Sequence, residues 1–186
     1  MTGGKIEECY VSNSHLKGSD HVASLVGQGV SGAIVQNCYA SAYVDCTTSN
    51  TGGLIGSAKE CTLSKSYFSG SVRTNNNSQV AGLVGFIENG FTPAVNNSVN
   101  LALFIITGSD GIARRIIPNT DRNATLSNNY SLSSTLLGRG YNLSSLATIP
   151  TNDSNYGSTK KHGANLPNDS DAKSSAFYST TLGWLH

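Results

Sequence analysis

Apolar residues recur along this chain at a nearly constant interval, separated by small and polar residues. The first recurring unit is a short box of two apolar residues closed by glycine, and its closing residues are Gly27, Gly56 and Gly85, about 29 residues apart. A degenerate fourth copy is assigned to Gly111-Ile112-Ala113-Arg114. Self-similarity at a fixed period indicates a repeat architecture.

A second unit recurs with a slightly variable spacing. It consists of an apolar residue followed four positions later by an aromatic or apolar one, and a small or polar residue precedes that second member. The pairs are Ile6 with Tyr10, Val35 with Tyr39, Leu63 with Tyr67, Val95 with Val99, and Leu126 with Tyr130. The varying distance between boxes and pairs places insertions between the two units, as expected of loops on a stacked scaffold.

The local patterns predict strands and turns. The segment 38–44 alternates small and larger side chains, and clusters such as 50–52 and 75–78 are typical of turns. A unit of about 29 residues with short strands cannot bury its own apolar face, so stacking of successive units is required. We therefore expect an all-β fold, a parallel β-helix (β-solenoid) of about four imperfect coils. The string of a leucine-rich repeat is absent.

Stacking predicts inward columns of equivalent residues. The first expected column is Leu25, Leu54, Leu83 and Ile112, and the second is Ile6, Val35, Leu63, Val95 and Leu126. The box glycines Gly27, Gly56 and Gly85 are expected at tight corners where only glycine turns without strain. If Cys9, Cys38 and Ser66 point inward, strand alternation turns Tyr10, Tyr39 and Tyr67 outward.

The boxes Gly53-Leu54-Ile55-Gly56 and Gly82-Leu83-Val84-Gly85, each followed by an Asn/Ser-Cys/Ser-Tyr strand, resemble the GLUG repeat of bacterial surface proteins. The segment 174–184 resembles the one that closes such arrays, so the resemblance covers residues 5–184. Departures are Ser24 in the first box and Ala113-Arg114 in the fourth. The resemblance implies a right-handed parallel β-helix at the bacterial cell surface, in adhesins or beside the catalytic part of IgA-protease-like peptidases.

The chain is expected to form a single structural domain in two parts. Residues 1–131 hold the GLUG-type β-helix repeats, and 132–186 form a loop-rich C-terminal cap packed on the last coil. Within that cap, four residues are expected to plug the apolar end of the last coil: Phe177, Tyr178, Leu182 and Trp184. Because the chain enters a repeat partway through, we also expect further coils before residue 1.

Composition narrows the classes of partner. The chain has 12 basic and 11 acidic residues, a net charge of +1, and no basic stripe, so nucleic acid is not an expected partner. The longest apolar run, Leu101 to Ile106, is far shorter than the ~20 residues that a membrane helix needs, so no membrane insertion is expected. We expect a monomeric, extracellular fragment that lacks its own signal peptide.

The sequence offers little catalytic chemistry. Neither a His-Glu-x-x-His zinc helix nor a Gly-x-Ser-x-Gly elbow occurs, and the acidic residues are scattered, so no catalytic, metal or cofactor site is expected. Cys9 and Cys38 are interpreted as buried thiols rather than a bridge, whereas spacing leaves the pairing of Cys46 with Cys61 open.

The remaining candidate site is the expected strip of Tyr10, Tyr39 and Tyr67. Stacked tyrosines suit a host glycan or a protein surface, and the alternative is that they shield the sheet beneath loops. The leading hypothesis is a non-catalytic adhesion module. Its alternatives are a rigid accessory stalk of a surface zinc peptidase and, less favoured, a carbohydrate-active β-helix enzyme.

Overall fold

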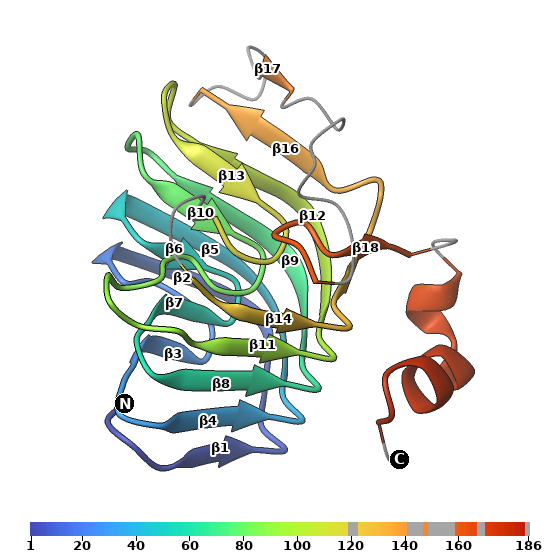
Figure 1. Ribbon diagram of the computed structural model, residues 1–186. Helices are drawn as coiled ribbons and strands as arrows, with labels where there is room; N and C mark the ends of the chain where they lie inside the picture. Colours follow the sequence, from blue (N-terminus) through green and yellow to red (C-terminus); the bar gives the residue numbers. More distant parts are fainter. Residues whose placement is uncertain (119–122, 141–146, 149–158, 167–169, 185–186) are drawn as a thin grey trace.

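The structure is a computed structural model of the chain, and it describes residues 1–118, 123–140, 147–148, 159–166 and 170–184. Parallel strands of successive coils pair with one another and form a β-solenoid of five turns (Figure 1). The all-β solenoid expected from the sequence is confirmed, with one more coil than expected.

One side of the solenoid is a five-stranded sheet, here called the short sheet. Its strands are β1 (Lys5–Glu7), β4 (Ala33–Gln36), β8 (Cys61–Ser64), β11 (Ala94–Asn96) and β14 (Thr125–Ser127). Their register places Ile6 beside Val35, Val35 beside Leu63, Leu63 beside Val95 and Val95 beside Leu126. The second expected column is therefore confirmed in all five coils.

The second side, here called the broad sheet, carries the longest strands. They are β2 (Tyr10–Asp20), β5 (Tyr39–Ser49), β9 (Tyr67–Thr74), β12 (Val99–Thr107), β15 (Tyr130–Ser131), β16 (Leu136–Arg139), β17 (Ala147–Thr148) and β18 (Ala164–Asn165). All pair in parallel except β17, which is antiparallel to β16. The inward side chains of β5, β9 and β12, such as Val44, Val72 and Ile105, are fully buried in the core.

The third side is more broken. It contains two small sheets. One is formed by β6 (Thr51–Gly52), β10 (Gln79–Ala81) and β13 (Ile112–Arg114), and the other by β3 (Val26–Gly29) and β7 (Ile55–Ala58). Leu25 N–H donates to the Leu54 carbonyl at 3.2 Å, and Leu54 N–H donates to that of Leu83 at 3.0 Å. The first three members of the first expected column therefore stack as predicted.

The fourth member of that column was placed wrongly. Ile112 pairs with Gln79, and Val84 N–H donates to the Ile116 carbonyl, so the fourth box begins at Arg115 and Ile116 stacks on Leu83. Two insertions cause the offset: a longer turn between Gly85 and β11, and an extra residue in β12 where the register with β9 shifts. The varying spacing of the pairs indicated insertions, but the fourth box was still assigned at the constant interval of 29 residues.

The box glycines serve a different purpose from the one expected. None of Gly27, Gly56 and Gly85 has a positive φ. A Cβ on Gly56 would lie 2.6 Å from the Gly27 carbonyl oxygen, and one on Gly85 would lie 2.2 Å from the Thr51 carbonyl carbon. Glycine is required there because neighbouring backbones approach closely.

The left-handed corner lies between the short and broad sheets instead. At this corner one residue per coil has a φ between 46° and 54°, namely Glu8, Asn37, Lys65, Asn97 and Asn128. Asparagine tolerates this region better than most residues. The next residue in each coil points into the corner, where the Ser66 hydroxyl accepts from Cys38 N–H at 3.1 Å and donates to the Ser64 carbonyl at 2.8 Å.

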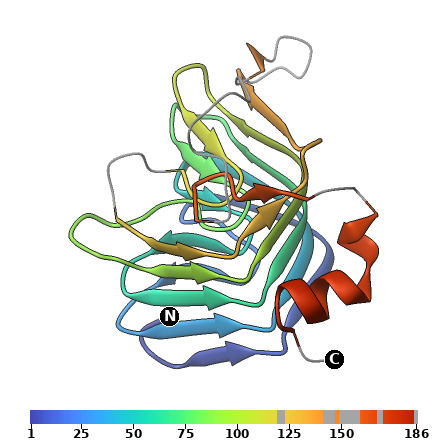
Figure 2. The ribbon, with the colours of Figure 1, turned by 45° about the vertical axis from the view of Figure 1, so that its right-hand side comes forward.

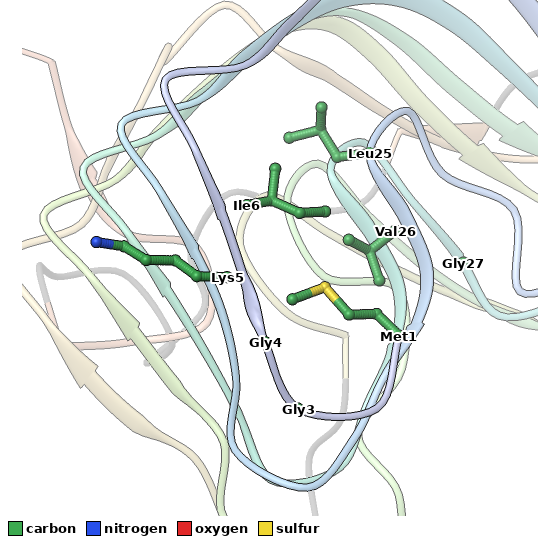
Figure 3. Close-up of a pocket in the computed structure, with 8 residues that line it drawn as sticks. All are labelled: Met1, Gly3, Gly4, Lys5, Ile6, Leu25, Val26 and Gly27. Carbon is green, nitrogen blue, oxygen red and sulfur yellow. The ribbon is translucent and has the colours of Figure 1, made fainter.

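The two ends of the core differ. At the N-terminal end, Met1, Ile6, Leu25 and Val26 point into an open hollow of about 460 Å³, while Lys5 points away from it (Figure 3). This hollow is the uncovered end of the first coil. At the other end, the segment 159–166 lies over the fifth coil, with Ala164 N–H donating to the Asn129 carbonyl at 2.8 Å and Leu166 buried.

The C-terminal aromatic residues do not plug the last coil, contrary to expectation. The segment 170–184, here called the strap, contains a 3₁₀ turn, η2 (Asp171–Lys173), and a π-helical turn, η3 (Phe177–Thr181). It runs beside the stack rather than over its end (Figures 1 and 2). The end of the core is already covered by 159–166, so the strap's aromatic side chains are buried against the side of the solenoid.

All four cysteines are free thiols, so Cys46 and Cys61 do not pair. Cys38 is buried as expected, whereas Cys9, in the first coil, is exposed. Within the described ranges, no helix combines the length and apolarity that crossing a bilayer requires.

Candidate functional site

The three tyrosines of the predicted strip form a continuous column on the outside of the broad sheet. Tyr10 pairs in register with Tyr39, and Tyr39 with Tyr67. The ring centroids of successive tyrosines are 5.2 Å and 5.1 Å apart, and the ring planes differ by only 6° and 5°. Tyr10 is 63% exposed, while Tyr39 and Tyr67 are half-buried.

This stacking determines which parts of the rings a partner can reach. Each ring lies face to face with its neighbour, so the surface of the column consists mainly of ring edges and hydroxyls. The outer face of Tyr10 has no described ring over it, whereas Tyr67 is stacked on Trp184 at 6.2 Å. The column therefore offers few open ring faces for a sugar.

Specific contacts hold the strap against the part of this face that belongs to the later coils. The Trp184 indole N–H donates to the Asn97 carbonyl at 3.0 Å, and the Asn128 amide donates to the Thr181 carbonyl at 2.9 Å. Tyr178 lies 4.7 Å from Trp184, centroid to centroid. The strap and the broad sheet share a second, smaller hydrophobic core, and its buried residues are Val99, Leu166, Phe177 and Leu182.

A groove of about 740 Å³ lies between the strap and the broad sheet. Tyr39, Tyr67, Tyr178 and Trp184 contribute to one part of its lining. Three leucines from β12 and the turn after β15 contribute an aliphatic part: Leu101, Leu103 and Leu132. A smaller hollow of about 420 Å³ is also lined by Trp184, together with residues that include Glu8, Asn37 and Lys65.

Leu103 is the residue of this face that sequence reasoning missed. The register between β12 and β9 shifts between Ala102 and Phe104, which leaves Leu103 unmatched, and its side chain is 70% exposed. Such bulges re-aim side chains and are frequent near binding sites. The signal was present in the run Leu101 to Ile106, because a strand apolar at successive positions must turn some of those residues outward.

The electrostatic environment of the groove is simple. Of the described residues that line it, one is charged, namely Lys173, which is exposed. Among the described residues, no carboxylate lies within ion-pair distance of its ammonium. Burial raises the pKa of the Tyr178 hydroxyl to about 12, and burial also raises the pKa of Tyr67. Both phenols are therefore neutral at physiological pH.

A cluster of polar side chains lies near the third side, but its hydrogen bonds are not connected as in a serine hydrolase. His21 Nδ1 is 2.9 Å from Asp20, and its Nε2 is 3.9 Å from Glu88. The Ser57 hydroxyl, which is fully buried, donates to Glu88 at 3.1 Å rather than to the histidine. In a serine hydrolase, the hydroxyl of the nucleophilic serine donates its hydrogen bond to the histidine that acts as base. Within the described part of the chain, no group of three His, Cys, Asp or Glu side chains is placed to hold a metal ion.

Comparison with solved structures finds this fold in a putative immunoglobulin A1 protease from Bacteroides ovatus. The similarity has a TM-score of 0.72 at 20% sequence identity and covers 88% of this chain and 49% of that protein. This chain therefore spans about half the length of the protein it matches. At such identity the likeness establishes the fold and not the activity. No protein-family model and no curated protein matches the chain.

Proposed function

We propose that this chain is a non-catalytic adhesion module of an exported bacterial surface protein and binds its partner through the outside of the broad sheet. One observation carries the proposal. Tyr10 and Leu103 are the exposed large apolar residues of the described chain, and both belong to this face. Leu103 lines the groove, and Tyr10 is stacked on Tyr39, which lines it as well. Apolar surface concentrated on one face of a domain marks an interaction site. The GLUG-like boxes and the fold shared with the Bacteroides ovatus protein support a cell-surface context.

Binding of the immobilised chain to a glycan array and to a panel of host extracellular proteins tests the proposal. We expect retention of at least one array member, and loss of that retention in a Tyr10→Ser, Leu103→Ser double variant. Glu60→Gln is the matched control, because Glu60 is exposed in the turn between β7 and β8. Absence of binding to every member of both panels would contradict an adhesion role.

A second candidate is a rigid accessory stalk of a surface zinc peptidase. Support for it comes from the five coils paired in parallel along the molecule and from the fold of the Bacteroides ovatus protein. The complete reading frame of the natural gene separates the candidates. A downstream His-Glu-x-x-His motif supports the stalk, whereas a lipoprotein signal with additional repeats supports the adhesin. Turnover of a uronic-acid polymer would contradict both and favour an enzyme.

A further inference from the structure

We propose that the groove between the strap and the broad sheet binds a peptide segment of a protein partner, with an apolar side chain in the groove and an adjacent Asp or Glu at Lys173. This inference rests on the proposed binding function and deepens it by naming the class of ligand. It follows from the apolar lining, the position of the one charge and the orientation of the aromatic rings.

The lining requires an apolar group. Leu101 and Leu132 are half-buried in the groove, and Leu103 extends into solvent from the bulge in β12. A partner side chain that covers Leu103 removes both its own surface and that of the leucine from water, which is the main driving force of association. The groove of about 740 Å³ is of the size that ordinarily receives a small ligand or a few side chains.

The positive charge of Lys173 favours a peptide with a carboxylate beside its apolar side chain. Lys173 belongs to η2 and is exposed at the groove, and none of the described residues that line the groove is acidic. An incoming carboxylate therefore meets a positive charge that forms no ion pair with a described carboxylate. A basic segment would meet repulsion at the same place.

The geometry of the rings favours a peptide over a sugar. Sugars bind aromatic residues mainly through open ring faces, but Tyr39 is stacked between Tyr10 and Tyr67, and Tyr67 is stacked on Trp184. Besides the tyrosines and the tryptophan, the described polar residues that line the groove are Ser69, Ser134 and Lys173. That set is small for the many hydroxyls of a glycan and sufficient for one carboxylate.

Selection from a phage-displayed library of random heptapeptides tests the inference, with residues 1–186 as bait. We expect enriched peptides to carry Asp or Glu next to an aliphatic or aromatic residue. A synthetic copy of the most enriched peptide should change the fluorescence of Trp184, the only tryptophan of the chain. Its affinity should fall at least tenfold for Leu103→Ser and for Lys173→Glu, and should be unchanged for Glu60→Gln.

Four results would overturn the inference: no enrichment above a library panned on Leu103→Ser, enrichment of basic peptides, equal binding of the Glu and Gln forms of the peptide, or displacement of the peptide by a neutral glycan. Leu103 and Lys173 are exposed, and thermal unfolding of the variants verifies that they fold. If array binding depends on Tyr10 and not on Leu103, the groove assignment fails while the adhesion function stands. If neither array nor library yields a ligand, both fail.

Discussion

At the residue scale, the left-handed corner is the feature that most constrains the sequence. Five coils place a non-glycine residue at a φ near 50° at the same point of the repeat. The sequence contains asparagine there in three of the five coils, so the column was visible in the repeat, but its backbone conformation was not. The corners were predicted at the box glycines instead, which are needed for close backbone contacts.

We expect Lys65→Asn to stabilise the protein by about 0.5–1 kcal/mol, because asparagine tolerates the left-handed region better than lysine. The reverse exchange in the preceding coil, Asn37→Lys, should destabilise by a similar amount. Urea unfolding of both variants and the parent measures the difference. A neutral Asn37→Lys together with a destabilised Lys65→Asn would contradict the assigned corner.

The thiols should differ sharply in reactivity. Burial raises the pKa of Cys61 to about 11 and also raises that of Cys38, so each remains protonated and covered near pH 8. Cys46 is buried, whereas Cys9 is exposed. A disulfide reagent should therefore modify one thiol in the native protein and all four after denaturation. Rapid modification of Cys38 or Cys61 in the native protein would show that the coils do not stack as described.

At the scale of elements, the strap is the part that sequence reasoning placed incorrectly. Its apolar composition correctly predicted burial, because Phe177 and Leu182 are covered. It did not specify the surface, since both the end of the core and its side were apolar. Because the segment 159–166 pairs with the fifth coil and covers the end of the core, the strap packs against the side of the solenoid. The sequence of 159–166 has no periodic pattern that would have predicted this pairing.

Contact of the strap with the sheet should weaken at high pH. The pKa of Tyr178 is raised to about 12, above its ordinary value of 10.0. A raised pKa means that the folded state favours the neutral phenol. The contribution of the Tyr178 phenol to the free energy of unfolding is therefore complete below pH 10 and is lost as the pH rises toward 12. Trp184 fluorescence should report this loss, and Tyr178→Phe should reduce it to the part that Tyr67, whose pKa is also raised and whose ring also stacks on Trp184, contributes. An identical transition in Tyr178→Phe would assign it to another group.

At the scale of the whole molecule, the repeat in the sequence carried most of the fold. Periodic spacing predicted the coil-to-coil columns of both sheets because like residues must stack when identical units pair in register. Spacing failed in the fourth box, where insertions in a turn and in β12 moved the register. The candidate site was predicted only in part: the tyrosines were identified, but the groove depends on Leu103 and on the strap.

Stability should vary along the stack. Leu83 is fully buried between neighbouring coils, whereas Leu25 lies beside the open end of the core. Leu83→Ala should therefore lower the free energy of unfolding by about 2–5 kcal/mol, and Leu25→Ala by clearly less. Denaturant unfolding compares the two variants. Equal costs would mean that the first coil is as enclosed as the third.

The stacked coils and the strap beside them can be tested together by nuclear Overhauser contacts between assigned aromatic rings. The structure predicts contacts of the Tyr39 ring with both Tyr10 and Tyr67, and of the Trp184 indole with Tyr67 and Tyr178. Contradiction would come from a Tyr39 ring without contact to either tyrosine, or from a Trp184 indole that contacts only the residues at the end of the fifth coil.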